Sequence, residues 1–142
     1  MLRELSAREC DELLGRHRFG RIGVRDAEGV YIVPIGYAVE DGAIYAHAAP
    51  GHKVHLMRLW PHVAFEVDEI EDGAHWRSVL VRGRFEEVQG EEARQHARLL
   101  LVKAFEGNPV SVTAGHGHRT HLADAVLFRV RMEDVTGRAE GL

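Results

Sequence analysis

The spacing of hydrophobic and polar residues along the chain changes from a helical period to the two-residue period of β-strands. Beyond the first 20 residues, apolar and polar positions alternate in six separate runs, and this alternation predicts half-buried strands. The predicted strands cover residues 21–26, 30–41, 43–49, 62–69, 76–88 and 125–138. Asp41-Gly42 lies between the second and third runs, where an Asp-Gly pair is typical of a tight hairpin turn.

Three helices are predicted around these strands. Ser6-Ala7-Arg8-Glu9 forms a capping box, in which the Ser6 hydroxyl accepts from the backbone N–H of Glu9 and the Glu9 carboxylate reaches back. The helix that begins there ends before Gly20, where the strand period starts. Two more helices are predicted over residues 53–60 and 91–106.

The order of these elements favours a mainly β fold of the α+β class, in which antiparallel strands wrap into a small barrel with peripheral helices. A doubly wound parallel sheet is disfavoured because the early strands have no crossover helices between them. No repeat or linker divides the chain, so residues 1–142 are predicted to form a single domain. Pro34 has no N–H to donate, which predicts an edge strand or a bulge, and Gly83 predicts a bend in its strand.

Composition restricts the class of protein further. With 45% hydrophobic and 28% charged residues, the chain is typical of a soluble globular protein. The net charge of −4 argues against nucleic-acid binding, and no apolar run approaches the ~20 residues of a membrane span. Charges throughout residues 1–14 argue against a secretory signal, and the single cysteine, Cys10, precludes an intrachain disulfide. A cytoplasmic location is therefore expected.

Histidine is abundant, with ten residues, and three of them lie close together at His116, His118 and His121. Close histidines raise the hypothesis of a metal site, which needs three or four ligands. No second cluster of cysteine or carboxylate residues at ligand spacing accompanies them, so no metal is predicted. A loop that contacts a partner subunit or covers an active site is the favoured interpretation.

Six segments of the sequence resemble the pyridoxamine 5′-phosphate oxidase-like FMN-binding split barrels, especially the branch of nitroimidazole-resistance-type reductases. The segments are GRIGV (20–24), VPIGY (33–37), IYAHAAPGHK (44–53), HVAFEVDE (62–69), WRSVLVRGRFEEV (76–88) and VTGR (135–138). Their order and spacing carry the resemblance across nearly the whole chain, although residues 108–125 depart from the family pattern. The resemblance implies a homodimeric antiparallel split β-barrel that binds two FMN molecules in clefts between its subunits.

The phosphate of FMN requires cations and the backbone N–H groups of a helix start. Gly51, His52 and Lys53 open the second predicted helix and supply both. By family position, Lys53 is expected to bind the phosphate, with His52 beside it. An ordinary solvated lysine is the alternative interpretation.

The flavin ring requires an apolar slot and backbone donors, because the protein orients and tunes the cofactor. The resemblance implies ring contacts at Pro34, Ile35, Gly36 and Tyr37. Gly36 lacks a side chain where a ring would approach. The period of this segment alone is equally compatible with an ordinary core strand.

Two further strands are implied to contact the cofactor. Tyr45 and His47 share one face of the third predicted strand, which in the family passes the ribityl chain and the phosphate. His47 is a candidate for cofactor contact and for catalytic proton donation, with a hydrogen-bonded core histidine as the alternative. On the fifth predicted strand, Ser78 is expected to bind the phosphate or ribityl chain, and Trp76 is expected to cover the ring.

The function implied by the resemblance is that of an FMN-dependent oxidoreductase, which passes reducing equivalents from NAD(P)H to a small acceptor such as a nitro compound. No G-x-G-x-x-G motif is present, so NAD(P)H is expected to bind only transiently over the flavin. Oxidation of pyridoxamine phosphate is disfavoured, because the chain ends in TGRAEGL instead of the family's Arg-Leu-x-Pro stretch. The alternatives are a non-catalytic flavin- or haem-binding protein and a dimeric barrel without a cofactor.

Overall fold

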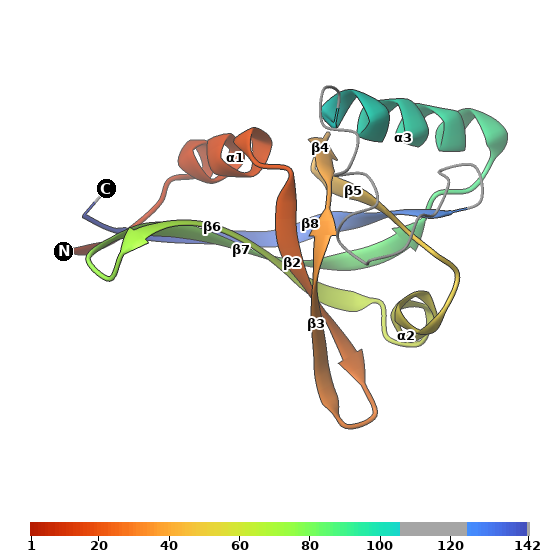
Figure 1. Cartoon of the computed structure of the whole chain (residues 1–142), viewed down its shortest axis with the longest axis horizontal. Helices are drawn as coiled ribbons and strands as arrows, with labels where there is room; N and C mark the ends of the chain where they lie inside the picture. Colours follow the sequence, from red (N-terminus) through yellow and green to blue (C-terminus); the bar gives the residue numbers. More distant parts are fainter. Residues whose placement is uncertain (106–124, 142) are drawn as a thin grey trace.

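The computed structural model describes residues 1–105 and 125–141, which form one antiparallel sheet with three helices packed on it (Figure 1). The strands are β1 (Leu2–Glu4), β2 (Phe19–Asp26), β3 (Gly29–Gly36), β4 (Ala38–Glu40), β5 (Ala43–Ala48), β6 (His62–Asp72), β7 (His75–Glu87) and β8 (Val126–Glu140). The helices are α1 (Ala7–Arg16), α2 (His52–Leu59) and α3 (Glu91–Ala104). The predicted mainly β fold with peripheral helices is confirmed.

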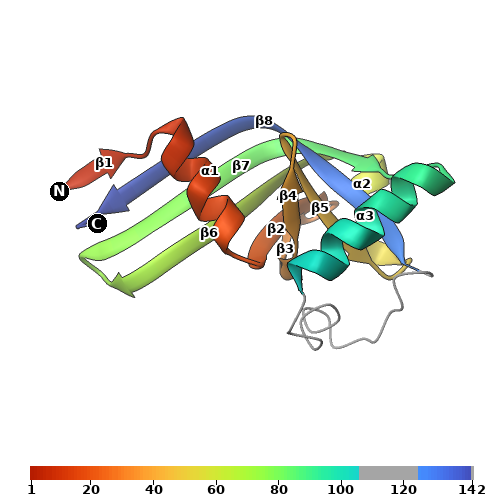
Figure 2. The same ribbon diagram turned by 90° about the horizontal axis from the view of Figure 1, so that it is seen from above.

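The described strands follow the order β3-β2-β6-β7-β8-β5-β4 along the sheet, and β1 pairs with β8 from outside this path. All of these pairings are antiparallel. The sheet is strongly twisted, and β3 contacts β5 where the two ends of the sheet approach each other, which gives the split barrel (Figure 2). The position of β3 at one edge confirms the prediction made from Pro34.

Two hydrophobic clusters lie on either side of β5. The larger lies inside the barrel, beneath α1 and α2, and Leu13, Phe65 and Phe128 are among its fully buried side chains. The smaller lies between α3 and the sheet and consists of Ala38, Ala43, Tyr45, Val88, Ala97, Leu101 and Leu127. Because alternate residues of β5 point into each cluster, every residue of this strand is buried.

The run predicted as one strand over residues 30–41 is two strands, which separate at Tyr37. The backbone N–H of Tyr37 donates to the carbonyl oxygen of Arg18 at 2.9 Å, and its hydroxyl donates to that of Leu14 at 2.6 Å. The ring is fully buried and stands edge-on to Phe65, with 4.8 Å between centroids. The prediction of a continuous strand is wrong because Tyr37 leaves the ladder and enters the core.

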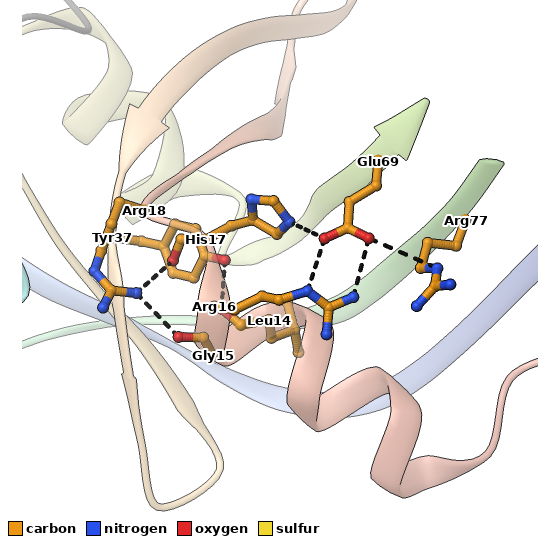
Figure 3. Close-up of polar contacts among 8 residues, drawn as sticks. All are labelled: Leu14, Gly15, Arg16, His17, Arg18, Tyr37, Glu69 and Arg77. Carbon is orange, nitrogen blue, oxygen red and sulfur yellow. Dashed lines mark hydrogen bonds and ion pairs between the residues drawn. The ribbon is translucent and has the colours of Figure 1, made fainter. Parts of the chain in front are cut away.

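Arg18 joins the C-terminal ends of two helices. Its Nε donates to the carbonyl oxygen of Ala104 in α3 at 2.7 Å. Its Nη1 donates at 3.0 Å to the carbonyl oxygens of Gly15 and His17 at the end of α1 (Figure 3). A cation in this position satisfies carbonyl groups that have no partner within their helix and interacts favourably with the helix dipole.

Gly83 lies at the irregularity in the pairing of β7 with β8, in agreement with the predicted bend. A Cβ at this position would lie 2.4 Å from the carbonyl oxygen of Arg131 and 2.7 Å from a methyl group of Val130. We therefore expect Gly83→Ala to lower the free energy of unfolding by about 1–3 kcal/mol, measured by urea unfolding. Gly15→Ala is the control, because a Cβ there meets nothing within 4 Å and alanine favours a helix. A Gly83→Ala variant as stable as this control would contradict the steric explanation.

Candidate functional site

The first turn of α2, where the phosphate is expected, is open at its N-terminal end. Gly51 is the N-cap and supplies no side-chain hydrogen bond, whereas Ser6 caps α1 through the predicted capping box. A Cβ placed on Gly51 would meet no other atom within 4 Å. The start of a helix presents backbone N–H groups and a partial positive charge, so this turn is suited to an anion.

Lys53 lies in the same turn and is half-buried. Burial lowers the pKa of its ammonium group to about 8. The other lysine of the chain, Lys103, is exposed on α3. Removing a cation from water costs free energy, and lysines with a lowered pKa are common at binding sites, so Lys53 stays a candidate for the phosphate contact.

Ring contacts join both ends of α2 to the hairpin formed by β2 and β3. At its start, the exposed His52 ring stands edge-on to Tyr31 of β3, with 6.2 Å between ring centroids. At its end, the guanidinium carbon of Arg25 on β2 lies 5.1 Å from the centroid of the Trp60 ring. The apolar side of the helix is buried in the larger cluster, so the position of its first turn is fixed by the barrel.

The segment expected to contact the flavin ring is divided between the surface and the core. Pro34 is exposed on the edge strand, whereas Ile35 and Tyr37 are fully buried in the larger cluster. Burial also raises the pKa of the Tyr37 hydroxyl. A Cβ on Gly36 would lie 2.7 Å from the ring of Phe105, so a ring of the chain itself fills the space beside this glycine. The contacts of Ile35, Gly36 and Tyr37 with a cofactor stay predictions. They concern the backbone atoms of these residues, because the side chains of Ile35 and Tyr37 are buried and Gly36 has none.

Tyr45 and His47 pair across the ladder with Arg129 and Leu127, and they lie on the face of β5 that belongs to the cluster beneath α3. Their exposed fractions are 8% and 9%, so both are almost fully buried. Hydrogen bonds to Glu86 and then to Tyr45 raise the pKa of Arg129. The burial of His47 matches the alternative of a core histidine, and its catalytic role stays a prediction.

Trp76 and Ser78 lie far from the start of α2 within one chain. They occupy the first part of β7, half-buried on the face that points away from the barrel interior. The opposite end of β7 is attached to α2, where Arg58 binds Glu87 at 2.7 Å. A strand rises about 3.3 Å per residue, so roughly 30 Å of strand separates the two ends. One protomer therefore does not bring these two residues to the α2 turn.

A polar cluster that the sequence analysis missed joins α1 to the hairpin of β6 and β7 (Figure 3). The Glu69 carboxylate accepts hydrogen bonds from Arg16 at 2.8 and 3.0 Å, binds the His17 ring, and lies 3.6 Å from Arg77. The hydrogen bonds from Arg16, helped by His17 and opposed by burial, lower the pKa of Glu69 to about 2. Apolar and polar residues alternate along β6, and this alternation places Glu69 on the inward face. A carboxylate on an inward face is the sequence signal that indicates a buried polar cluster.

Within residues 1–105 and 125–141, no group of three or more histidine, cysteine or carboxylate side chains is placed to hold a metal ion. His116, His118 and His121 lie outside the described residues. Across the part of the chain that the structure describes, no helix has both the length and the apolar character needed to span a bilayer.

Known proteins share this fold. A sequence profile of the family described as "Pyridoxamine 5′-phosphate oxidase" matches residues 6–139. An uncharacterised protein of Rhizobium meliloti (strain 1021) is 29% identical, and the match covers 97% of this chain and 95% of that protein. The structure of an FAD-binding protein from Mesorhizobium loti is 33% identical, with 99% of both chains covered and a TM-score of 0.85. A Bacteroides thetaiotaomicron structure, described as a candidate 5-nitroimidazole antibiotic resistance protein, is 16% identical and shows the fold alone, with a TM-score of 0.78 over 98% of this chain and 87% of that one.

The half-burial of Lys53 predicts a pH-dependent contribution to stability. Its pKa falls from the ordinary 10.5 to about 8 on folding, so the unfolded state binds more protons between these values and stability rises with pH there. Lys53→Met removes this rise and stabilises the protein at pH 7 by more than the ~0.5 kcal/mol typical of surface changes. Urea unfolding at pH 7.5 and 9.5 measures the slope, with Lys103→Met as the control. Equal slopes in wild type and Lys53→Met would show that the ammonium group is not buried.

Proposed function

Because the chain belongs to the pyridoxamine 5′-phosphate oxidase family, we propose that it is a flavin-dependent oxidoreductase that binds the cofactor phosphate at the start of α2. The observation that carries this proposal is the half-buried ammonium group of Lys53 in a helix turn that no side chain caps. A cation and backbone N–H groups in one turn suit a phosphate dianion. The residues present therefore fit a flavin nucleotide.

The cofactor and the chain divide the work between them. When bound, a flavin supplies the hydride chemistry between NAD(P)H and a small acceptor, for which we propose a nitro compound or a similar molecule. The chain supplies the phosphate contact through Lys53 and orients the cofactor along the edge strand near Pro34. His47 is the proposed proton donor. The Mesorhizobium loti relative is described as FAD-binding, and FMN and FAD share the phosphate that this turn suits.

We also propose a homodimer that forms through the face of β3, β2, β6 and β7 that points away from both hydrophobic clusters. On β3 this face carries Val30 and Ile32, with exposed fractions of 69% and 66%, next to the exposed Pro34. Exposed β-branched side chains on an edge strand favour association with another chain. Beside them lies a hollow of about 380 Å³, whose lining includes the small residues Gly23 and Ala64. A second copy of this chain suits such a surface.

The proposed dimer accounts for the position of Trp76 and Ser78. By the strand pairings these residues lie on the same face as Ile32, although the length of β7 separates them from the α2 turn of their own chain. A partner subunit that packs on this face supplies its own copies of both residues. The cofactor contacts expected of Trp76 and Ser78 are therefore proposed to come from the second subunit.

Lys53→Ala is expected to weaken FMN binding about tenfold to a hundredfold, because a hydrogen bond to a charged group contributes about 1.5–3 kcal/mol. Quenching of flavin fluorescence measures the affinity, and consumption of NADPH with a nitroaromatic acceptor measures turnover. Lys53→Arg should retain most of the affinity, and Lys103→Ala should retain all of it. A purified wild-type protein that binds no flavin, or that shows the Soret band of haem instead, would overturn the proposal.

Ile32→Glu is expected to convert the dimer to a monomer, because the added carboxylate would lose its hydration on burial in the proposed interface. Sedimentation equilibrium measures the change. Val102→Glu, on the exposed side of α3, is the control and should leave the dimer intact. If the cofactor site is shared between subunits, FMN affinity falls in the same variant that dissociates. A wild-type protein that is monomeric at the concentrations used would contradict the proposed interface.

A further inference from the structure

Three charged side chains lie together on the face of the sheet that is proposed to form the dimer. Arg21 of β2 donates from Nε to the Glu66 carboxylate at 2.8 Å, and its Nη2 lies 2.7 Å from the same carboxylate and 3.0 Å from that of Asp68. Glu66 and Asp68 are two positions apart on β6, so both side chains point to this face. Oxygen atoms of two carboxylates therefore share one nitrogen atom of a single guanidinium group.

The Arg21 triad, formed by Arg21, Glu66 and Asp68, carries one excess negative charge when both carboxylates are ionised. A proton shared between the two carboxyl groups removes this excess, because like charges this close oppose the ionisation of both groups. A hydrogen bond between two carboxyl groups requires a proton on one of them. Burial raises the pKa of Glu66, helped by the hydrogen bond with Asp68 and opposed by Arg21, in agreement with a shared proton.

The Arg21 triad lies between two groups of exposed apolar side chains on the proposed interface. By the strand pairings, Ile32 lies on one side of it and Ile70 on the other, with exposed fractions of 66% and 68%. The side chains of Glu66 and Asp68 are themselves 32% and 26% exposed. A second copy that covers the apolar side chains on both sides therefore withdraws the two carboxyl groups further from water.

The strands that flank β6 place one cation next to the two carboxyl groups. On one side this cation is Arg21, and on the other side the uncharged residues Leu80 and Ser78 of β7 lie opposite Glu66 and Asp68. Arg82 of β7 and Arg138 of β8 come next on this face; both are exposed, and neither forms an ion pair with the triad in the described part of the chain. A proton is therefore the nearest means of neutralising the triad when a partner excludes water from it.

We infer that the dimer takes up a proton at each Arg21 triad when it forms, so that it is tightest at low pH and weakens as the pH rises. The inference rests on the proposed dimer and names what regulates it. In the separate protomer, water solvates the second negative charge, so both carboxyl groups can ionise. In the dimer, a shared proton leaves one guanidinium and one carboxylate, which together form a neutral hydrogen-bonded pair.

Sedimentation equilibrium from about pH 5.5 to about pH 8.5 tests this coupling. We expect the dissociation constant of the wild-type dimer to rise at least about tenfold over this range, and by no more than about a hundredfold per pH unit, because each dimer holds two triads. Glu66→Gln replaces the protonated carboxyl group with a neutral amide, so it abolishes the rise and keeps the dimer tight at high pH. Asp68→Asn acts in the same way. Glu92→Gln, an exposed position in the first turn of α3, is the matched control and retains the rise.

Far-ultraviolet circular dichroism shows that each variant is folded at each pH. A wild-type dissociation constant that stays the same over this range overturns the inference, and so does a rise that both Glu66→Gln and Asp68→Asn retain. A constant that falls as the pH rises also overturns it, because cations such as the partner subunit's Arg82 would then pair with the ionised triad. A wild-type protein that is monomeric at every pH overturns the proposed interface instead, so the two failures are distinguishable.

Discussion

Tyr37 leaves the edge strand and enters the barrel, and the contacts made there position the elements around the candidate site. Its backbone N–H binds Arg18, its hydroxyl binds Leu14 within α1, and its ring packs on Phe65 of β6. A buried hydroxyl that loses its acceptor costs about 1–3 kcal/mol, so β3 is held in one register against α1. That register determines which residues of β3 face α2 and which face outward, and Tyr31 is among the former.

Local patterns in the sequence predicted most of the helices and strands, because each pattern depends on interactions between residues that are close together in the chain. Pro34 indicates an edge strand for this reason. Contacts between distant residues leave no such pattern. The alternation of β6 indicates that Glu69 faces inward, but it does not identify Arg16, 53 positions away, as the partner of this carboxylate. Gly36 shows the same limit, because its missing side chain makes room for the ring of Phe105 from the end of α3, and no local pattern indicates that contact.

Some features of the candidate site could likewise be predicted from the sequence, and others could not. The place of His52 and Lys53 in the first turn of a helix could be predicted from the sequence, and their contact with a phosphate stays a prediction. The distance of Trp76 and Ser78 from that turn could not, because alternation shows which residues share a face and not how far along the sheet they lie. The burial of Lys53 arises from the packing of α2 on the barrel. Burial disfavours the charged form of Lys53, and it would also strengthen the attraction for the phosphate proposed to bind there.

Arg18 has a consequence for how the molecule opens. Its side chain holds the C-terminal carbonyl groups of α1 and α3 together, so fraying of either helix removes a partner from the cap of the other. Proteins open locally in cooperative units, and we expect these two helices to open as one unit although most of the sheet separates them in the chain. Solvent would then reach the smaller cluster, which includes Tyr45, through an opening that loosens both helices at once.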